Sequence, residues 1–95
     1  MAAYLIAQVE ITDPELYEEY RRLVPGLIAS HGGRYLARSE ALEVLEGNLH
    51  SNRLAIVEFP HMTALRAFYE SDAYQPLMAI RRRAARSTLL AVAGL

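Results

Sequence analysis

Glu58 is the side chain with the clearest potential for chemistry in this sequence. It lies in the stretch Val57-Glu58-Phe59, where residues alternate with a period of two, and this parity places it on the same strand face as Leu54 and Ile56. A carboxylate among apolar side chains is partly desolvated, which suits it to accept a proton as a general base. We therefore predict that Glu58 is catalytic, with an ion pair to an arginine as the alternative role.

His31 is a second candidate for acid–base chemistry. It falls at the C-terminal end of a predicted helix, directly before Gly32-Gly33. A histidine there can hydrogen-bond to the helix end and complement the helix dipole, so a capping role competes with a catalytic one at the rim of a cavity. The sequence has two further histidines, His50 and His61, and the three lack the spacing of metal ligands. We predict His31 as the second catalytic residue, and neither a metal nor a cofactor.

Arginines and tyrosines near the second and third predicted strands could bind a ligand. A guanidinium can bind carboxylate or enolate oxygens through two hydrogen bonds, and Arg34, Arg38 and Arg53 are candidates for this role. The alternative for each is an ion pair with Glu43, Glu46 or Glu58. The complete predicted ligand-binding set is Tyr4, Ile6, Gln8, Tyr35, Arg38, Arg53, Leu54 and Ile56.

Other charged and aromatic residues are predicted to be structural. The arginine run 81–83 lies near the end of a predicted helix, where basic side chains complement the dipole and face solvent. Tyr17, Tyr20 and Phe68 follow helical spacing and are predicted to belong to the core. The sequence has no serine elbow, phosphate loop or dinucleotide-binding glycine pattern.

The composition excludes several classes of chemistry and partner. All ten basic residues are arginines and the chain has no cysteine, which excludes a lysine Schiff base, a thiolate nucleophile, a disulfide and a zinc–thiolate site. The formal net charge of -1 argues against binding to nucleic acid or to a membrane surface. The first residues read as a strand and lack the pattern of a signal peptide, so we expect a cytoplasmic protein.

The chain contains two similar strand–helix units about half a chain apart. Val9-Glu10-Ile11 ends the first predicted strand as Val57-Glu58-Phe59 ends another, and Thr12-Asp13-Pro14 then starts a helix that Gly32-Gly33 stops. A second helix is predicted at 61–70. A capping pattern at Asp72 and Gln75 then starts a third helical segment that runs to about residue 86. Strands are predicted at 4–11, 34–38, 53–59 and 87–93, with a short additional strand at 42–46. All of these belong to one domain, residues 1–95.

The order of these elements predicts an α+β fold, the ferredoxin-like sandwich. This order, in which strand, helix, strand is followed by strand, helix, strand, is the split βαβ arrangement. It places both helical connections on one side of an antiparallel sheet, with the first and third strands central. The other face would carry Tyr4, Ile6, Leu54 and Ile56. Because an apolar patch on a central sheet face needs a cover, we predict a homodimer in which two such faces meet around a cavity.

Several short motifs together resemble a known family. They are Tyr4-Leu5-Ile6, Thr12-Asp13-Pro14-Glu15, His31-Gly32-Gly33-Arg34-Tyr35, Leu45-Glu46-Gly47, Val57-Glu58-Phe59-Pro60 and Tyr69-Glu70-Ser71. Over nearly the whole chain this combination is similar to the short bacterial proteins of domain of unknown function 1330, within the dimeric α/β-barrel superfamily. The resemblance implies that two subunits pair sheet to sheet as a dimeric α/β barrel. Members of the wider superfamily include cofactor-free monooxygenases, haem-degrading enzymes, dehydratases and ligand-sensing domains, so the fold does not choose the function.

Two classes of function remain. The first is a dimeric barrel that binds a small apolar or aromatic organic molecule, with cofactor-free acid–base or monooxygenase-like chemistry led by Glu58. The second is a non-catalytic ligand-binding or assembly module whose open sheet face is mainly a dimer interface. Binding of single-stranded RNA is disfavoured, because the strand at 53–59 has aliphatic side chains where stacking aromatics are expected and Glu58 would repel phosphate.

Overall fold

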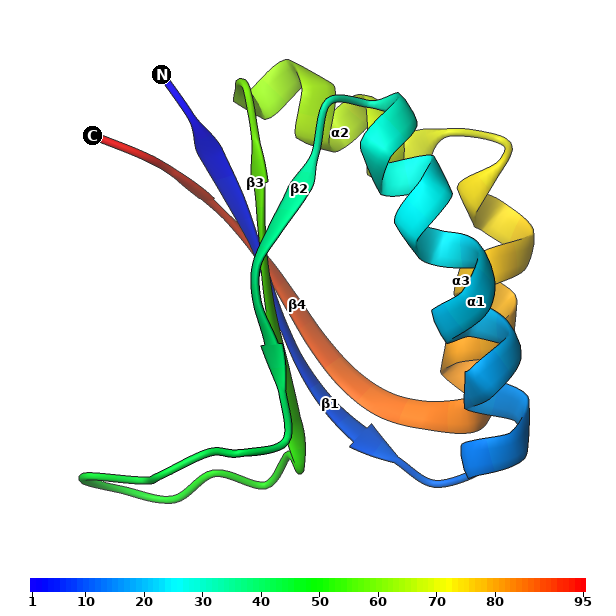
Figure 1. Ribbon diagram of the computed structural model, residues 1–95, viewed down its shortest axis with the longest axis vertical. Helices are drawn as coiled ribbons and strands as arrows, with labels where there is room; N and C mark the ends of the chain where they lie inside the picture. Colours follow the sequence, from blue (N-terminus) through cyan, green and yellow to red (C-terminus); the bar gives the residue numbers. More distant parts are fainter.

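Four antiparallel strands form one sheet, and three helices cover one of its faces (Figure 1). The computed structural model describes all residues 1–95. Its elements, in chain order, are β1 (Ala3–Ile11), α1 (Pro14–Ser30), β2 (Arg34–Ser39), β3 (Arg53–Phe59), α2 (Met62–Glu70), α3 (Tyr74–Ala84) and β4 (Ala85–Ala93). The strand order β2-β3-β1-β4 places β1 and β3 at the centre. The predicted ferredoxin-like α+β fold is confirmed.

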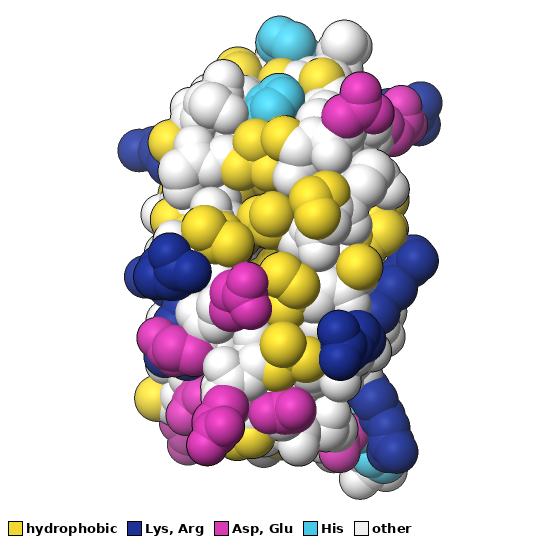
Figure 2. Space-filling model, turned by 90° about the vertical axis from the view of Figure 1, so that its right-hand side faces the viewer, with side chains coloured by type: hydrophobic (Ala, Val, Ile, Leu, Met, Phe, Trp, Pro, Cys, Tyr) yellow, Lys and Arg dark blue, Asp and Glu magenta, His cyan; other side chains and the backbone are white.

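The two faces of the sheet differ because side chains alternate along each strand. In β1, Ala3, Leu5, Ala7 and Val9 face the helices, while Tyr4, Ile6 and Gln8 lie on the other side. We call that other side the open face. Its central residues are paired across strands β1 and β3 as Tyr4 with Glu58, Ile6 with Ile56 and Gln8 with Leu54. The outer surface of the helix layer, in contrast, carries acidic and basic side chains beside hydrophobic ones (Figure 2).

The segment 40–52 between β2 and β3 has no regular secondary structure, so the predicted strand at 42–46 is wrong. The segment forms an arm that projects from the lower end of the sheet, on the side away from the helices (Figure 1). Its alternating pattern is typical of a strand, but a strand forms only where a neighbour accepts and donates its backbone hydrogen bonds. Strands β2 and β3 pair only up to Ser39 and Leu54. Asn52 still donates its amide to the Val9 carbonyl of β1, and the predicted strand residues 42–46 have no strand partner.

Local capping explains where the helices begin. The side chain of Asp13 accepts a hydrogen bond from the Leu16 amide at 3.2 Å, which confirms the predicted start of α1. The predicted capping pattern at Asp72 is wrong. It is the hydroxyl of Ser71 that accepts the Tyr74 amide at 3.2 Å, while the Gln75 side chain donates to backbone carbonyls before α3.

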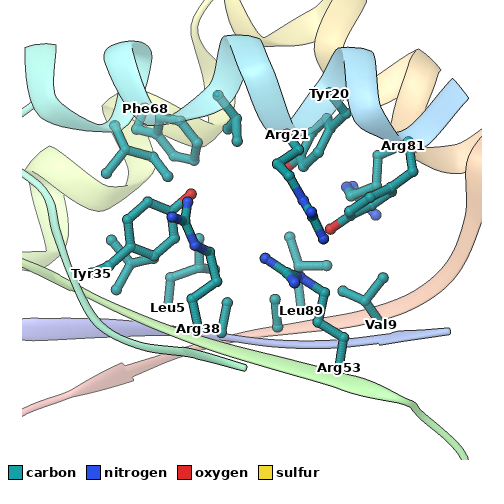
Figure 3. Close-up of a pocket in the computed structure, with 16 residues that line it drawn as sticks. Leu5, Val9, Tyr20, Arg21, Tyr35, Arg38, Arg53, Phe68, Arg81 and Leu89 are labelled. Atoms are coloured by element: carbon teal, nitrogen blue, oxygen red, sulfur yellow. The ribbon is translucent and has the colours of Figure 1, made fainter. Parts of the chain in front are cut away.

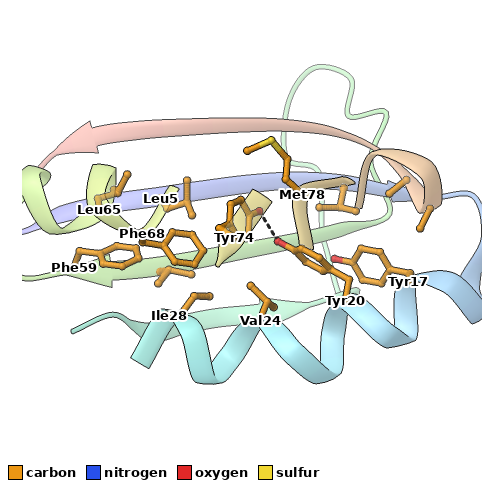
Figure 4. Packing of buried hydrophobic residues seen from close by; sticks show 14 of the residues in the cluster. Leu5, Tyr17, Tyr20, Val24, Ile28, Phe59, Leu65, Phe68, Tyr74 and Met78 are labelled. Carbon is orange, nitrogen blue, oxygen red and sulfur yellow. Dashed lines mark hydrogen bonds between the residues drawn. The ribbon is translucent and has the colours of Figure 1, made fainter. Parts of the chain in front are cut away.

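Aromatic side chains fill the core between the helices and the sheet (Figure 4). Phe59, Phe68 and Tyr74 are the largest fully buried side chains, and the rings of Phe68 and Tyr74 lie 4.6 Å apart. The hydroxyls of Tyr20 and Tyr74 share a buried hydrogen bond of 2.8 Å. This bond ties α1 to α3 and satisfies two polar groups that would be costly to bury alone. Tyr17, Tyr20 and Phe68 are buried as predicted.

The turn after α1 leaves no room for a side chain at Gly33. A Cβ there would lie 2.6 Å from Cγ2 of Ile28 and 2.8 Å from Cε1 of Phe59. We therefore expect Gly33→Ala to lower the free energy of unfolding by about 1–3 kcal/mol, measured by urea denaturation. Gly26→Ala is the matched control, since a Cβ there meets nothing within 4 Å and should stabilise helix α1 by about 0.5–1 kcal/mol. Equal effects of the two changes would contradict this packing.

Candidate functional site

A cavity lies inside the protein between the helix layer and the sheet (Figure 3). It offers about 50 Å³ that a water molecule can enter, and 12 of its 16 lining residues are hydrophobic. Phe68, Tyr35 and Leu5 lie toward one end, and Arg21, Arg53 and Arg81 lie toward the other. One end of the cavity is therefore aromatic and aliphatic, with Arg38 beside Tyr35, and the other end is strongly basic.

The alternation of β3 and the helical repeat of α3 place the basic side chains inside. Arg53 occupies the first position of β3 and shares the inward face with Val57, and only 7% of its surface is exposed. Arg81 follows Tyr74 by two helical turns and Met78 by one, so it lies on the buried stripe of α3 and is 6% exposed. The predicted solvated position is therefore wrong for Arg81.

A bulge in β2 brings Arg38 to the same cavity. Tyr35 pairs with Val57 and faces inward, but the register then shifts at Leu36, so that Arg38 pairs with the inward-facing Ala55. Without this extra residue, the period of two would place Arg38 on the open face. The Arg38 guanidinium instead lies over the Tyr35 ring, 4.5 Å from its centroid. Tyr35 and Arg38 thus act as a stacked pair at the edge of the cavity.

The cavity holds four arginines and no acidic residue. No carboxylate oxygen lies within 4 Å of Arg38, Arg53 or Arg81. The predicted ion pairs of Arg38 and Arg53 with glutamates are therefore absent. Nε of Arg81 donates to the Tyr74 hydroxyl at 3.4 Å. Arg21 forms a surface ion pair with Glu18 at 3.6 Å, but its Nε is buried without a hydrogen-bond partner.

The tyrosines of the cavity do not supply the missing negative charge. Burial raises the pKa of Tyr17, and the neighbouring Arg53 guanidinium offsets this only in part. Burial likewise raises the pKa of Tyr35, although the nearby Arg38 guanidinium lowers it in part. Burial also raises the pKa of Tyr20. At neutral pH these three side chains are therefore uncharged phenols, which can donate hydrogen bonds but cannot balance the guanidinium charges.

The structure divides the predicted site residues between two separate faces. Tyr35, Arg38 and Arg53 line the cavity. The other predicted ligand-binding residues and Glu58 lie on the open face, and these are Tyr4, Ile6, Gln8, Leu54, Ile56 and Glu58. Glu58 accepts a hydrogen bond from Nε of Arg34 at 2.8 Å, and the side chain is 24% exposed. The expected grouping of all these residues around one cavity is therefore not found within one subunit.

His31 occupies the end of helix α1 outside the cavity lining. Its Nδ1 donates to the carbonyl oxygen of Leu27 at 3.0 Å, and its ring meets that of Phe68 edge to face. This is the capping geometry that competes with a catalytic role. Sequence reasoning missed Arg21 and Arg81 as cavity residues. The spacing of Arg81 from Met78 and Tyr74 was the available signal, since it repeats every three or four residues.

No group of three or more histidine, aspartate or glutamate side chains is arranged to hold a metal ion. None of the helices combines the length and apolar character needed to span a membrane.

The sequence matches one family model over residues 2–95, that of the domain of unknown function DUF1330. The chain belongs to the DUF1330 family. No curated protein matches it.

Solved structures of other proteins share the fold at low sequence identity. A protein of unknown function from Rhodopseudomonas palustris aligns with a TM-score of 0.79 at 19% identity, covering 99% of this chain and 82% of the other. A dimeric ferredoxin-like protein of unknown function from Jannaschia sp. CCS1 aligns with a TM-score of 0.75 at 13% identity, covering 99% and 100%. SnoaB, a cofactor-independent oxygenase from Streptomyces nogalater, aligns with a TM-score of 0.72 at 13% identity, covering 99% and 93%. At these identities the likeness shows the fold alone.

The buried charge of Arg53 should lower the stability of the ligand-free DUF1330 protein. A buried ion without a counter-charge is costly, and an apolar side chain of similar length removes that cost. We expect Arg53→Met to raise the free energy of unfolding by roughly 1–4 kcal/mol in urea denaturation. The exposed Arg82 provides the control, since Arg82→Met should change stability by no more than about 0.5 kcal/mol. A loss of stability in the Arg53 variant would show that the protein itself balances this charge.

Proposed function

We propose that this protein binds a small organic molecule in the cavity between its helices and its sheet, and that it does so as a homodimer. The observation that carries the binding proposal is the interior cavity with an apolar, aromatic end and an end of buried arginines. Binding sites for small molecules commonly combine an apolar lining with a few polar groups that fix orientation. A cavity that served packing alone would have no reason to bury Arg53 and Arg81.

The open face supports the homodimer. Leu90 and Val92 on β4 are 52% and 46% exposed, next to the half-buried Ile6 and Tyr4 of β1. An exposed apolar patch of this kind marks an interaction surface. The Jannaschia protein and a protein of unknown function from Thermobifida fusca YX, both of this fold, are described as dimeric. A second copy related by a two-fold axis would bring one open face onto the other.

The arm at 40–52 offers a second contact in such a dimer. It extends on the same side of the sheet as the open face, away from the helices (Figure 1). Leu45 near its tip is 87% exposed and Val44 is 51% exposed. Apolar side chains on a projecting segment gain stability when a partner surface covers them. In the proposed dimer, the arm of each subunit would pack beside the sheet of the other.

A charge on the open face tests the dimer. Leu90→Glu should convert the dimer to a monomer, because a carboxylate from each subunit would be buried in the interface without a partner. Light scattering coupled to size-exclusion chromatography measures the mass at micromolar concentration. The control is Thr63→Glu, since Thr63 is exposed on α2 in the helix layer, and this variant should keep the dimer mass. A monomeric wild-type protein would contradict the assembly proposed here.

Filling the cavity tests the binding of a small molecule. Native mass spectrometry of gently purified protein should show twice the chain mass with an additional retained small molecule. Ala55 lines the cavity, and we expect Ala55→Leu to lose that additional mass because the larger side chain occupies the free volume. Ala79→Leu on the exposed side of α3 should retain it. An adduct that survives in the Ala55 variant would show that the molecule binds elsewhere.

Catalysis by Glu58 or His31 stays a prediction. Glu58 forms an ion pair with Arg34 on the open face, and such a pair could equally serve as a polar contact in the proposed dimer interface. Once a bound molecule is identified, Glu58→Gln separates the two roles. Loss of turnover with an intact dimer and intact binding would support catalysis, whereas loss of the dimer alone would assign Glu58 to the interface.

A further inference from the structure

We infer that the cavity binds the anion of a small organic acid, with the carboxylate held by Arg53 and Arg81 and the apolar body against Phe68 and Tyr35. This inference rests on the proposed binding in that cavity and adds the chemical class of the ligand. It follows from the charges of the site, from the direction of its donors and from the shape of its apolar end.

The charge of the site is unbalanced. Arg53 and Arg81 are both more than nine-tenths buried, and a guanidinium stays protonated at any pH that the protein meets. The cavity contains no carboxylate, and burial raises the pKa of each of its three lining tyrosines, so these phenols are neutral. Buried charges in proteins are normally paired. An anionic ligand would supply the counter-charge that the chain itself lacks.

The hydrogen-bond donors converge on one place from opposite layers. Arg21 extends down from α1 and Arg53 extends up from β3, so that their guanidinium groups point toward one another with Arg81 beside them (Figure 3). Like charges in this arrangement repel unless an anion lies between them. The Nε of Arg21 is buried without an acceptor, although the same side chain reaches Glu18 at the surface. The planar guanidinium forks match the two oxygens of a carboxylate.

The rest of the cavity selects an acid with an apolar body. Leu5, Ile28 and Val57 line it together with the rings of Phe68 and Tyr35. An inorganic anion would fill only the arginine end and leave this apolar surface without contacts. The free volume of about 50 Å³ is far below that of typical sites for drug-sized ligands, which excludes a nucleotide. A short branched chain attached to one carboxylate comes closest to this size. A cavity that encloses a benzene ring measures about 150 Å³, so a ring would enter only if the lining side chains moved apart.

Isothermal titration calorimetry with benzoate and benzamide tests the ligand class on the intact protein. The two probes share a ring and nearly the same shape, and only benzoate carries a negative charge. We expect benzoate to bind at least about tenfold more tightly than benzamide, which is the effect of losing one charge-assisted hydrogen-bonded pair. Inorganic phosphate at equal ionic strength tests whether the site binds an anion that has no apolar part. Isobutyrate tests whether it binds a carboxylate with a smaller apolar group.

The variants connect binding to the arginines. Arg53→Met should reduce the affinity for benzoate by about tenfold or more while leaving that for benzamide unchanged, and Arg81→Met should do the same. Arg82→Met, on the exposed side of the same helix, should leave both affinities unchanged. Because the Arg53→Met change is expected to stabilise the fold, loss of binding is not confused with unfolding, and the circular dichroism spectrum confirms this.

The alternative outcomes separate this inference from the proposed function. Equal affinities for benzoate and benzamide, both abolished in Ala55→Leu, would support binding in the cavity but overturn the assignment of an acid. Tighter binding of phosphate than of either carboxylate would overturn the claim that the ligand is an organic acid. Failure of both benzoate and isobutyrate to bind would overturn the inference, while the adduct in native mass spectrometry would still decide whether the cavity holds a molecule.

Discussion

The structure depends on one constraint, namely that the sheet has two apolar faces and the chain has helices for only one of them. Alternation in β1 and β3 directs Leu5, Val9 and Val57 toward the helices and Ile6 and Ile56 away from them. The covered face builds the aromatic core and the cavity. The open face keeps apolar side chains in contact with solvent, which is the physical reason to expect a second subunit. The core, the cavity and the open face are thus consequences of the same period of two.

The proposed binding in the cavity would oppose the stability of the fold. The Tyr20–Tyr74 hydrogen bond and the stacked rings around Phe68 stabilise the layer contact in which the cavity lies. Arg53 and Arg81 enter the same layer with their charges unbalanced, which costs free energy in the ligand-free protein. Sites built for binding commonly carry such local instability, because the groups that receive the ligand have no partner in its absence. The surrounding aromatic core supplies the rigidity that keeps these side chains in place.

The family and the fold leave several classes of function possible. The same architecture occurs in a cofactor-independent oxygenase and in proteins of unknown function, so the sheet and helices are a scaffold shared by different activities. What distinguishes this chain is the set of side chains that the scaffold directs inward. The cavity lacks an acidic side chain that could act as a base, whereas Glu58 lies on the open face beside Arg34. The geometry therefore supports the proposed binding of an anion in the cavity, and acid–base chemistry by Glu58 would take place on the open face.

The sequence by itself determined the element order, the ferredoxin-like topology and the parity of β1 and β3, because periodicity and capping are local signals. The DUF1330 family was recognisable from motifs such as Val57-Glu58-Phe59-Pro60 for the same reason. Only the tertiary structure decided that the cavity lies under the helices and that Arg81 is buried, since charge predicts exposure and the burial of a helix face depends on what packs against it. Only the register shift at Leu36 turned Arg38 inward, and only the absence of a partner strand left 42–46 as part of an arm. Each of these outcomes depends on contacts between residues far apart in the chain, and the helical spacing of Arg81 from Met78 and Tyr74 was the only local signal among them.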